Sequence, residues 1–268
     1  MEISHSDLNV KKLIMVPALI ALAITIARLV GELVGGSSVL FNRDAGGGGA
    51  LVGIVWLVPI FGVYFAIKLV RQGSGPESVG KVIVLALAGL VIAGVATALI
   101  FSFFGDPNVS VSFGGAIGQQ LGIAIASLVV VLILRKGWPA FFQTMLSYAF
   151  ASRIPVLIVM LIAMLGDWGT HYELGPPGYP EMGFLTKFIL IALFPQMTFW
   201  IMFTMVFGAL FGGIAAALVR PKVTAEADVD VAQPLEEADE GVGQVPEQAR
   251  QDVAPAPDDD PEKAEDTP

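Results

Sequence analysis

Six apolar stretches constrain this chain more than any other feature of its sequence. The plainest runs from Val82 to Phe104 without a charged residue. A bilayer core about 30 Å thick is crossed by a helix of about 20 apolar residues, and backbone polar groups inside it must be satisfied internally. The sequence therefore predicts an all-α, polytopic membrane protein with six transmembrane helices. We expect the spans at about residues 13–34, 50–70, 81–104, 113–134, 139–165 and 186–219.

The composition favours this class and disfavours several kinds of site. Hydrophobic residues make up 55 % of the chain and charged residues 15 %, against about 25 % charged in soluble domains. The sequence has no cysteine and only two histidines. We therefore expect no disulfide, no metal and no cofactor.

The negative charge of the chain is confined to its last part. Residues 1–222 hold 13 basic and 9 acidic residues, whereas residues 223–268 hold 2 basic and 15 acidic residues. The second part has no aromatic residue and is rich in Ala, Pro, Glu and Asp. It is typical of a disordered acidic tail. We expect it in the cytoplasm, either as a solvating tail or as a docking segment for a basic cytoplasmic partner, and we expect no nucleic-acid binding.

The distribution of basic residues predicts the orientation. Lys and Arg accumulate in the cytoplasmic segments of membrane proteins. Placing the N-terminus inside puts nine basic residues near cytoplasmic ends and leaves Arg43 and Lys187 in outer loops. Both termini are then cytoplasmic, as suits a bacterial inner membrane. The nine are Lys11, Lys12, Lys68, Arg71, Lys81, Arg135, Lys136, Arg220 and Lys222.

One charge interrupts the fifth stretch. Arg153 is the only charged residue between Gly137 and Gly166, and an arginine at the centre of a bilayer costs roughly 2.5–3.5 kcal/mol on insertion scales. We hypothesise an intramembrane polar cluster in the outer half of the bilayer, with Glu32 paired to Arg153. Two interpretations stay open, a structural cross-link between helices and a functional cavity. The proposed members are Arg28, Glu32, Gln119, Gln120, Arg153 and Gln196.

Small residues mark candidate packing faces. In the fourth span they recur every four residues, a spacing that lets another helix approach closely. A shorter pair lies near the inner end of the sixth span. We expect tight packing there, within one chain or in a homo-oligomer surrounded by the lipid bilayer. The residues are Gly114, Gly118, Gly122, Gly208 and Gly212.

The last outer loop and the sixth span carry further expectations. A metal site formed by Asp167, His171 and Glu173 is conceivable, but one histidine with loosely spaced acids is a weak pattern. We favour a proline-stiffened loop with its aromatic residues, Tyr172 among them, at the membrane interface. The sixth span is longer than a bilayer core, so it must tilt, start in the interface or break at Pro195.

Residues 135–165 resemble part of a known family. The segment from Phe142 to Ala149, followed by Pro155 and preceded by the turn Arg135–Gly137, is similar to the start of a membrane helix in the Yip-type multi-span family. The resemblance implies a helical membrane protein, and in eukaryotes the family is linked to vesicle traffic. Arg153 and a sixth span depart from the pattern, so no functional residue is carried over.

Three functions are compatible with these features. The favoured one is a non-enzymatic membrane protein of organisational or accessory type, since no nucleophile–base pair, paired carboxylates or metal motif is evident. The second is a small-solute or ion transporter or channel that uses the polar cluster. Pro59 and Pro155 fall in the second helices of two three-span halves, a hint of inverted symmetry. The third is a lipid-modifying membrane enzyme.

Overall fold

The computed structural model describes residues 9–47 and 49–219, and within these ranges the chain is helical and contains no β-strand. Six of its helical segments are long and apolar enough to cross a membrane. The prediction of an all-helical chain with six membrane-length helices is confirmed. The acidic tail predicted at 223–268 lies outside the described residues.

The first five segments follow the predicted order. They are α1 (Val10–Leu33), α2 (Leu57–Arg71), α3 (Val79–Phe104), α4 (Phe113–Leu134) and α5 (Pro139–Gly166). Two short 3-10 turns, η1 (Ala45–Gly47) and η2 (Ile54–Trp56), precede α2. The sixth segment is continuous but irregular. It consists of α6 (Phe184–Lys187), the π-helical η3 (Phe188–Leu193), α7 (Phe194–Met197) and α8 (Phe199–Leu218).

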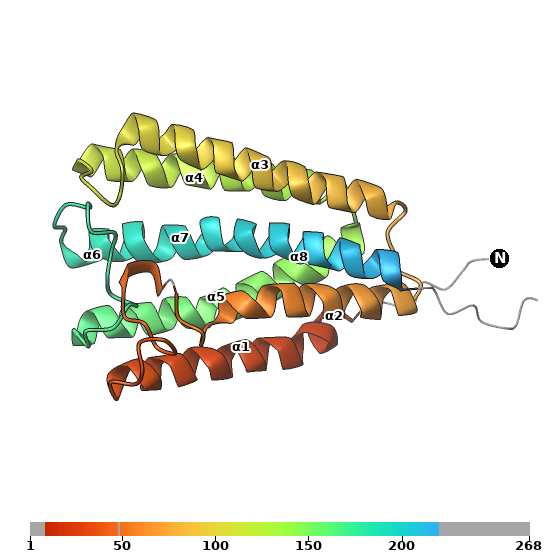
Figure 1. Cartoon of the computed structure of the whole chain (residues 1–268), viewed down its shortest axis with the longest axis horizontal. Coiled ribbons are helices and arrows are strands. Elements are labelled where there is room, and N and C mark those ends of the chain that lie inside the picture. The colour runs from red at the N-terminus through yellow and green to blue at the C-terminus, as the bar shows by residue number, and fades with distance from the viewer. Residues whose placement is uncertain (1–8, 48, 220–268) are drawn as a thin grey trace, which may run out of the picture. The chain divides into compact units, whose positions relative to one another are not determined.

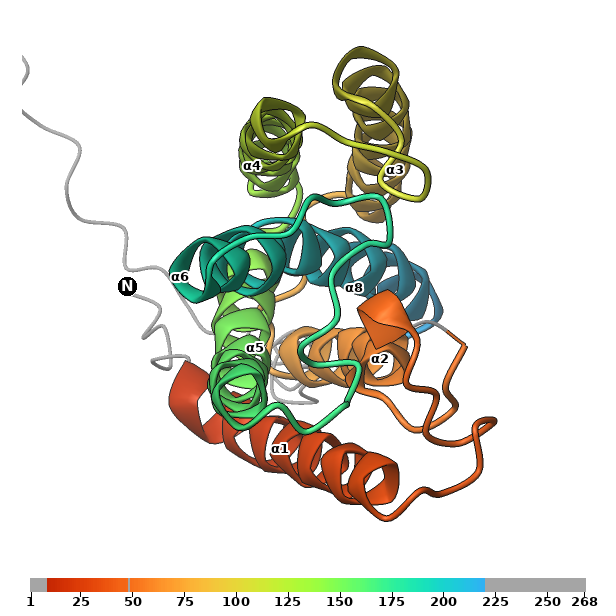
Figure 2. The same cartoon turned by 90° about the vertical axis from the view of Figure 1, so that its left-hand side faces the viewer.

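The sixth segment lies at the centre of the bundle (Figures 1 and 2). The α3–α4 hairpin packs on one side of it, α2 and α5 pack on the other, and α1 lies outermost against α5. In the most apolar 18-residue stretch of the sixth segment, 61 % of the residues are buried. The corresponding share is 11 % in α3 and 22 % in α1. A substitution in the sixth segment therefore alters packing contacts with most of the other helices directly.

The start of the second span differs from the prediction. The helix α2 begins at Leu57, whereas the apolar pattern predicted a span from residue 50. Gly53 is extended, with φ −175°, and separates the apolar residues before it from the helix. Pro59 consequently lies in the first turn of α2, where its missing N–H removes no helical hydrogen bond. Pro155 lies past the middle of α5, so the two prolines do not occupy equivalent positions.

Glycines let the central segment approach its neighbours. A Cβ on Gly62 of α2 would lie 2.8 Å from the carbonyl oxygen of Gly208 in α8, so the two backbones touch. Gly212 is covered by the ring of Phe141. In α4, Gly118 and Gly122 face side chains of α3, whereas a Cβ added to Gly114 would meet no atom within 4 Å. With the exception of Gly114, these glycines thus serve packing inside the chain.

The two ends of the bundle are built differently. The end that holds residues 72–78 and 135–138, here called the short-turn end, is closed by packed aromatic residues. Trp138 stacks on Phe141 and donates from Nε1 to the Ser74 carbonyl oxygen at 2.7 Å. The other end, the loop end, holds the longer connections 34–53, 105–112 and 167–183 (Figure 1).

Candidate functional site: a cavity at the loop end

A cavity of about 470 Å³ lies at the loop end. Its walls come from α1, the segment before α2, the loop between α3 and α4, α4, α5, the loop after α5 and the sixth segment. A volume of this size is in the range of small-molecule sites, which are roughly 300–1,000 Å³. Outside the cavity lining, Tyr148 is buried against Phe61 and Phe65 with ring centroids 5.2 and 5.5 Å away.

Arg153 lies in the wall of this cavity. It is 3 % exposed, and its guanidinium lies 4.6 Å from the centre of the Trp200 ring. Its Nε has no hydrogen-bond partner among the described residues, and no carboxylate of those residues forms an ion pair with it. A cation over an indole ring is attracted by the ring's electrons, but this contact leaves the N–H groups of the guanidinium without acceptors.

Two amides of the same cavity are also incompletely satisfied. The Oε1 atoms of Gln120 and Gln196 are buried and accept no hydrogen bond from the described residues. The Nε2 of Gln196 has only the Met160 sulfur, at 3.5 Å. Buried polar atoms are usually paired, so three such atoms around one cavity indicate a place prepared for another molecule.

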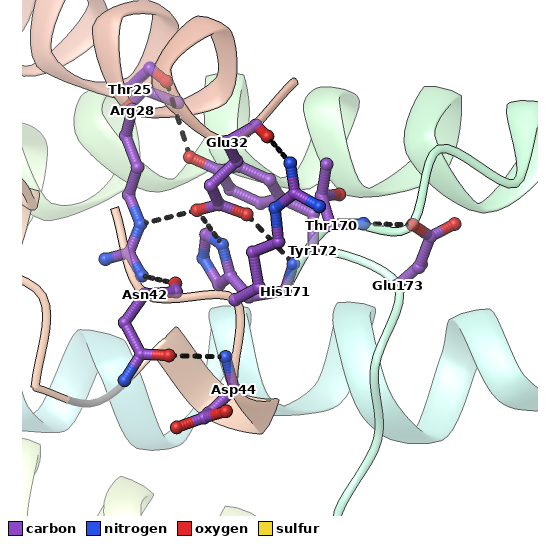
Figure 3. A network of polar contacts seen from close by, with 10 residues as sticks. Thr25, Arg28, Glu32, Asn42, Asp44, Thr170, His171, Tyr172 and Glu173 are labelled. Carbon is purple, nitrogen blue, oxygen red and sulfur yellow. Dashed lines mark hydrogen bonds and ion pairs between the residues drawn. The ribbon is translucent and has the colours of Figure 1, made fainter. Parts of the chain in front are cut away.

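Glu32 forms a different arrangement, which we call the Glu32 junction (Figure 3). Its side chain is fully buried, and its Oε1 accepts from Arg28 Nε at 2.9 Å. The same oxygen lies 2.5 Å from His171 Nδ1, and Oε2 accepts from the backbone N–H of His171 at 3.0 Å. The predicted pair between Glu32 and Arg153 is therefore wrong, because both carboxylate oxygens are occupied by Arg28 and His171.

The junction also fixes the loop between α1 and α2. Arg28 donates from Nη2 to the Asn42 carbonyl oxygen at 3.0 Å, and Arg43 donates to the backbone oxygen of Glu32. Asn42 turns the chain by accepting from the Asp44 N–H at 2.8 Å (Figure 3). One carboxylate at the end of α1 thus holds Arg28, which contacts the loop after α1, and His171, which is 139 residues away from Glu32 in the sequence.

The loop after α5 is folded by its own acidic residue. Glu173 accepts from the N–H groups of Trp168 at 3.1 Å and Thr170 at 2.5 Å. Tyr172 is 3 % exposed and donates to the Thr25 carbonyl oxygen at 3.3 Å. The expected place of Tyr172 at the membrane interface is therefore wrong. Glu173 and His171 each have partners in the fold, so the conceivable site with Asp167 is not assembled.

Burial alters the acid–base behaviour of two residues in this loop. Burial lowers the pKa of His171, and the neighbouring Glu32 carboxylate opposes that change only in part. The imidazole is therefore neutral near pH 7, with Nδ1–H placed to donate to Glu32. Burial also raises the pKa of Tyr172, so its hydroxyl stays protonated and can donate.

The same loop reaches across the end of the bundle to α4. Tyr179 donates to Gln119 Oε1 at 2.8 Å and accepts from Gln120 Nε2 at 3.1 Å. The N–H of Val111 donates to the Gly178 carbonyl oxygen at 2.8 Å. The loop is thus attached to α1 at one side and to α4 at the other, and residues of it cover the cavity.

The predicted cluster is therefore divided in two. Arg28, Gln120, Arg153 and Gln196 line the cavity. Glu32 and Gln119 lie behind it and fasten the loops. Sequence reasoning missed the roles of His171, Tyr179 and Trp200. For Trp200 a signal existed, because it follows Gln196 by four residues, a spacing that places two side chains on one helical face.

A second, smaller cavity adjoins the first. It has a volume of about 270 Å³ and lies between α4 and the α6–α7 part of the sixth segment. Gln120 and Leu190 belong to the walls of both cavities, and its other wall residues include Ile117, Leu121 and Phe194. A cavity with several polar side chains in its wall therefore borders an apolar cavity, and the two share Gln120 and Leu190.

No family model, curated protein or solved structure matches this chain.

Proposed function

We propose that this chain is a multi-pass membrane protein that binds a small solute in the loop-end cavity and moves it across the membrane. The single observation that carries this proposal is the state of Arg153. It is buried in the cavity wall without a carboxylate or hydrogen-bond acceptor from the described residues. An ionisable residue inside a membrane segment is costly and marks a solute or ion pathway by default.

A purely structural role fits Arg153 less well. A buried cation that cross-links helices has to form hydrogen bonds to them, as Arg28 does with Glu32 and Asn42. Arg153 contacts the ring of Trp200 instead. Its desolvation is thus not offset inside the fold, and a ligand that supplies an acceptor would offset it.

The irregular backbone of the sixth segment supports transport rather than binding alone. A π-helical stretch at Phe188–Leu193 is followed by Pro195 and by a distorted Thr198, with φ −118° and ψ −77°. Residues from this stretch line the cavity. Interrupted helices at a solute site are common in secondary transporters, where they change shape between states.

The positive-inside count supports an orientation of the cavity relative to the membrane. With both termini in the cytoplasm, the cavity faces outwards and the packed short-turn end faces inwards. Such an arrangement corresponds to one end state of an alternating-access cycle.

An organisational role is the second proposal. The helix α3 is largely exposed, and Gly94 of α3 and Gly114 of α4 have no atom of the described chain near an added Cβ. Small residues on an exposed helix are suited to contact with another membrane helix. This second proposal includes assembly into a homo-oligomer, and it is the one with which the Yip-type resemblance agrees.

Cysteine accessibility tests the first proposal, because the chain has no native cysteine. Val156 lines the cavity, so Val156→Cys is expected to react with a membrane-impermeant maleimide added to intact cells. Ser37→Cys, in an exposed loop, is the positive control, and Ala149→Cys, which is fully buried, is the negative control. Silence at Val156 with labelling at Ser37 contradicts a water-filled cavity, and silence at Ser37 in intact but not in opened cells reverses the orientation.

A further inference from the structure

The balance of charge in the cavity is positive. Its described wall residues include Arg28 and Arg153, and no aspartate or glutamate is among them. The carboxylate of Glu32, directly behind the wall, neutralises Arg28. The uncompensated charge is therefore that of Arg153, which calls for a single negative charge on the ligand.

The donors around Arg153 are suited to an oxygen acid. A guanidinium presents its N–H groups in a planar fork that matches the two oxygens of a carboxylate. The Nε2 group of Gln196 lies in the same wall with only a weak sulfur acceptor. It is available to donate to a second atom of the same acidic group.

Several wall residues near Arg153 are apolar and are suited to an apolar part of the ligand. Trp200, Met160 and Ile191 belong to the wall that holds Arg153. Beyond Leu190, the adjoining cavity is bounded by Ile117, Leu121 and Phe194. A fully hydrophilic anion would leave these surfaces without a partner, whereas a hydrocarbon chain would cover them.

We propose that the cavity binds an anionic amphiphile, a molecule with one singly charged oxygen-acid group held by Arg153 and a hydrocarbon chain that lies past Leu190 towards the space between α4 and η3. This proposal rests on the proposed function, since it names the class of solute for the same cavity. The acidic group can come from a free fatty carboxylate or from an anionic lipid, and the experiment below separates the two sources.

The test measures binding of radiolabelled octanoate to the full chain in phosphatidylcholine nanodiscs, with empty discs subtracted. Unlabelled octanoate, octanol, octylamine and acetate serve as competitors. We expect octanoate to compete at least about tenfold better than octanol or acetate, because both the charge and the chain contribute. Arg153→Gln is expected to weaken binding roughly 10- to 100-fold, and Arg153→Lys less, because lysine keeps the charge but not the fork.

Two further variants keep the test decisive. Arg71→Gln removes an exposed arginine at the short-turn end and should leave octanoate binding unchanged. Val156→Phe places a ring in the cavity and should abolish binding even if Arg153→Gln does not fold. In discs that contain phosphatidylglycerol, weaker octanoate binding to the wild type identifies an anionic lipid as the occupant, and unchanged binding identifies a free carboxylate.

Equal competition by octanol and octanoate, preference for octylamine, or unchanged binding by a folded Arg153→Gln variant would overturn the proposal. These outcomes can be distinguished from a failure of the proposed function. If Val156→Cys is labelled but octanoate does not bind, the cavity stands and the ligand class is wrong. If Val156→Cys is silent, the proposed function itself fails.

Discussion

Two arginines are buried in the same half of this bundle, and they differ in the hydrogen bonds that the fold provides for them. Arg28 donates to the Glu32 carboxylate and to the Asn42 carbonyl oxygen. Arg153 is similarly buried, but among the described residues its guanidinium has the ring of Trp200 and no hydrogen-bond acceptor. Both side chains line one cavity. Under the proposed function, the difference separates a charge that holds the structure together from a charge that binds another molecule.

Burial alone therefore does not distinguish a structural charge from a ligand-binding charge. The number of hydrogen bonds that the charged group forms within the fold is more informative. Both guanidinium groups lose water on folding. At Arg28 the free energy of desolvation is offset by partners in the chain, so substituting a partner should destabilise the fold. At Arg153 the free energy of desolvation is not offset in this way, so removing the charge should stabilise the fold.

The largest effect is expected at the Glu32 junction. Glu32→Ala leaves Arg28 buried without its carboxylate and releases His171, and it should lower the free energy of unfolding by about 3–5 kcal/mol. The measurement is the temperature at which the detergent-solubilised protein loses its monodisperse peak in size-exclusion chromatography. Glu77→Gln, at an exposed acid, is the matched control. A stability equal to that of the control would show that the junction is dispensable.

The second effect should have the opposite sign. Arg153→Met replaces an unpaired cation by an apolar side chain of similar length, and it should raise the free energy of unfolding by about 2–3 kcal/mol after loss of the Trp200 contact. The same heating assay measures it. A lower melting temperature for Arg153→Met would place Arg153 in the same class as Arg28 and end the contrast.

The third prediction extends the contrast to the packed interior. Gly62→Ala places a methyl group 2.8 Å from the Gly208 carbonyl oxygen and should cost about 1–2 kcal/mol by overpacking. Gly94→Ala has open space in a helix of the same bundle and should be neutral or slightly stabilising. Equal melting temperatures for the two variants would mean that the α2–α8 contact is looser than the structure shows.

The smallest effect concerns pH. Because burial lowers the pKa of His171 in the folded protein, the unfolded chain takes up a proton first as the pH falls. Stability is therefore full above the unfolded value of about 6.5 and declines as the pH falls towards the folded value. Melting temperatures between about pH 8 and pH 5.5 should fall for the wild type. The His171→Gln variant should be less stable at the upper end of this range but show a flatter profile, and parallel profiles would exclude His171 as the cause.

Much of the fold could be predicted from the sequence, because the bilayer demands long apolar helices. The ends of α4 match the predicted boundaries, and those of α5 nearly do. The start of α2 could not be found in this way. Ala50 and Ile54 are as apolar as a helical span, but Ala50 is buried in a loop and Ile54 in the 3-10 turn η2, and both border the cavity. An apolar run marks burial and does not by itself distinguish a helix from a covered loop.

The site could be predicted only in part, for a geometric reason. The sequence pattern predicted that Arg28, Arg153 and Gln196 lie at a similar depth in the outer half of the bilayer, and these residues do line one cavity. Depth says nothing of which helices are neighbours, and so it paired Glu32 with the wrong cation. His171 was considered only together with Asp167 and Glu173, since its contact with Glu32 joins a loop to a helix across 139 residues without any repeating pattern.

The π-helical stretch Phe188–Leu193 also affects how insertions and deletions would act on this chain. A π-turn holds one residue more than an α-turn, and each residue of an α-helix turns the chain by about 100°. Deleting one residue from this stretch would restore a regular α-helix and leave Lys187 on its present side relative to Gln196 and Trp200, whereas deleting one residue from α8 would rotate the parts on either side of the deletion by that angle. The register of the sixth segment, rather than its composition, thus decides which side chains face the cavity.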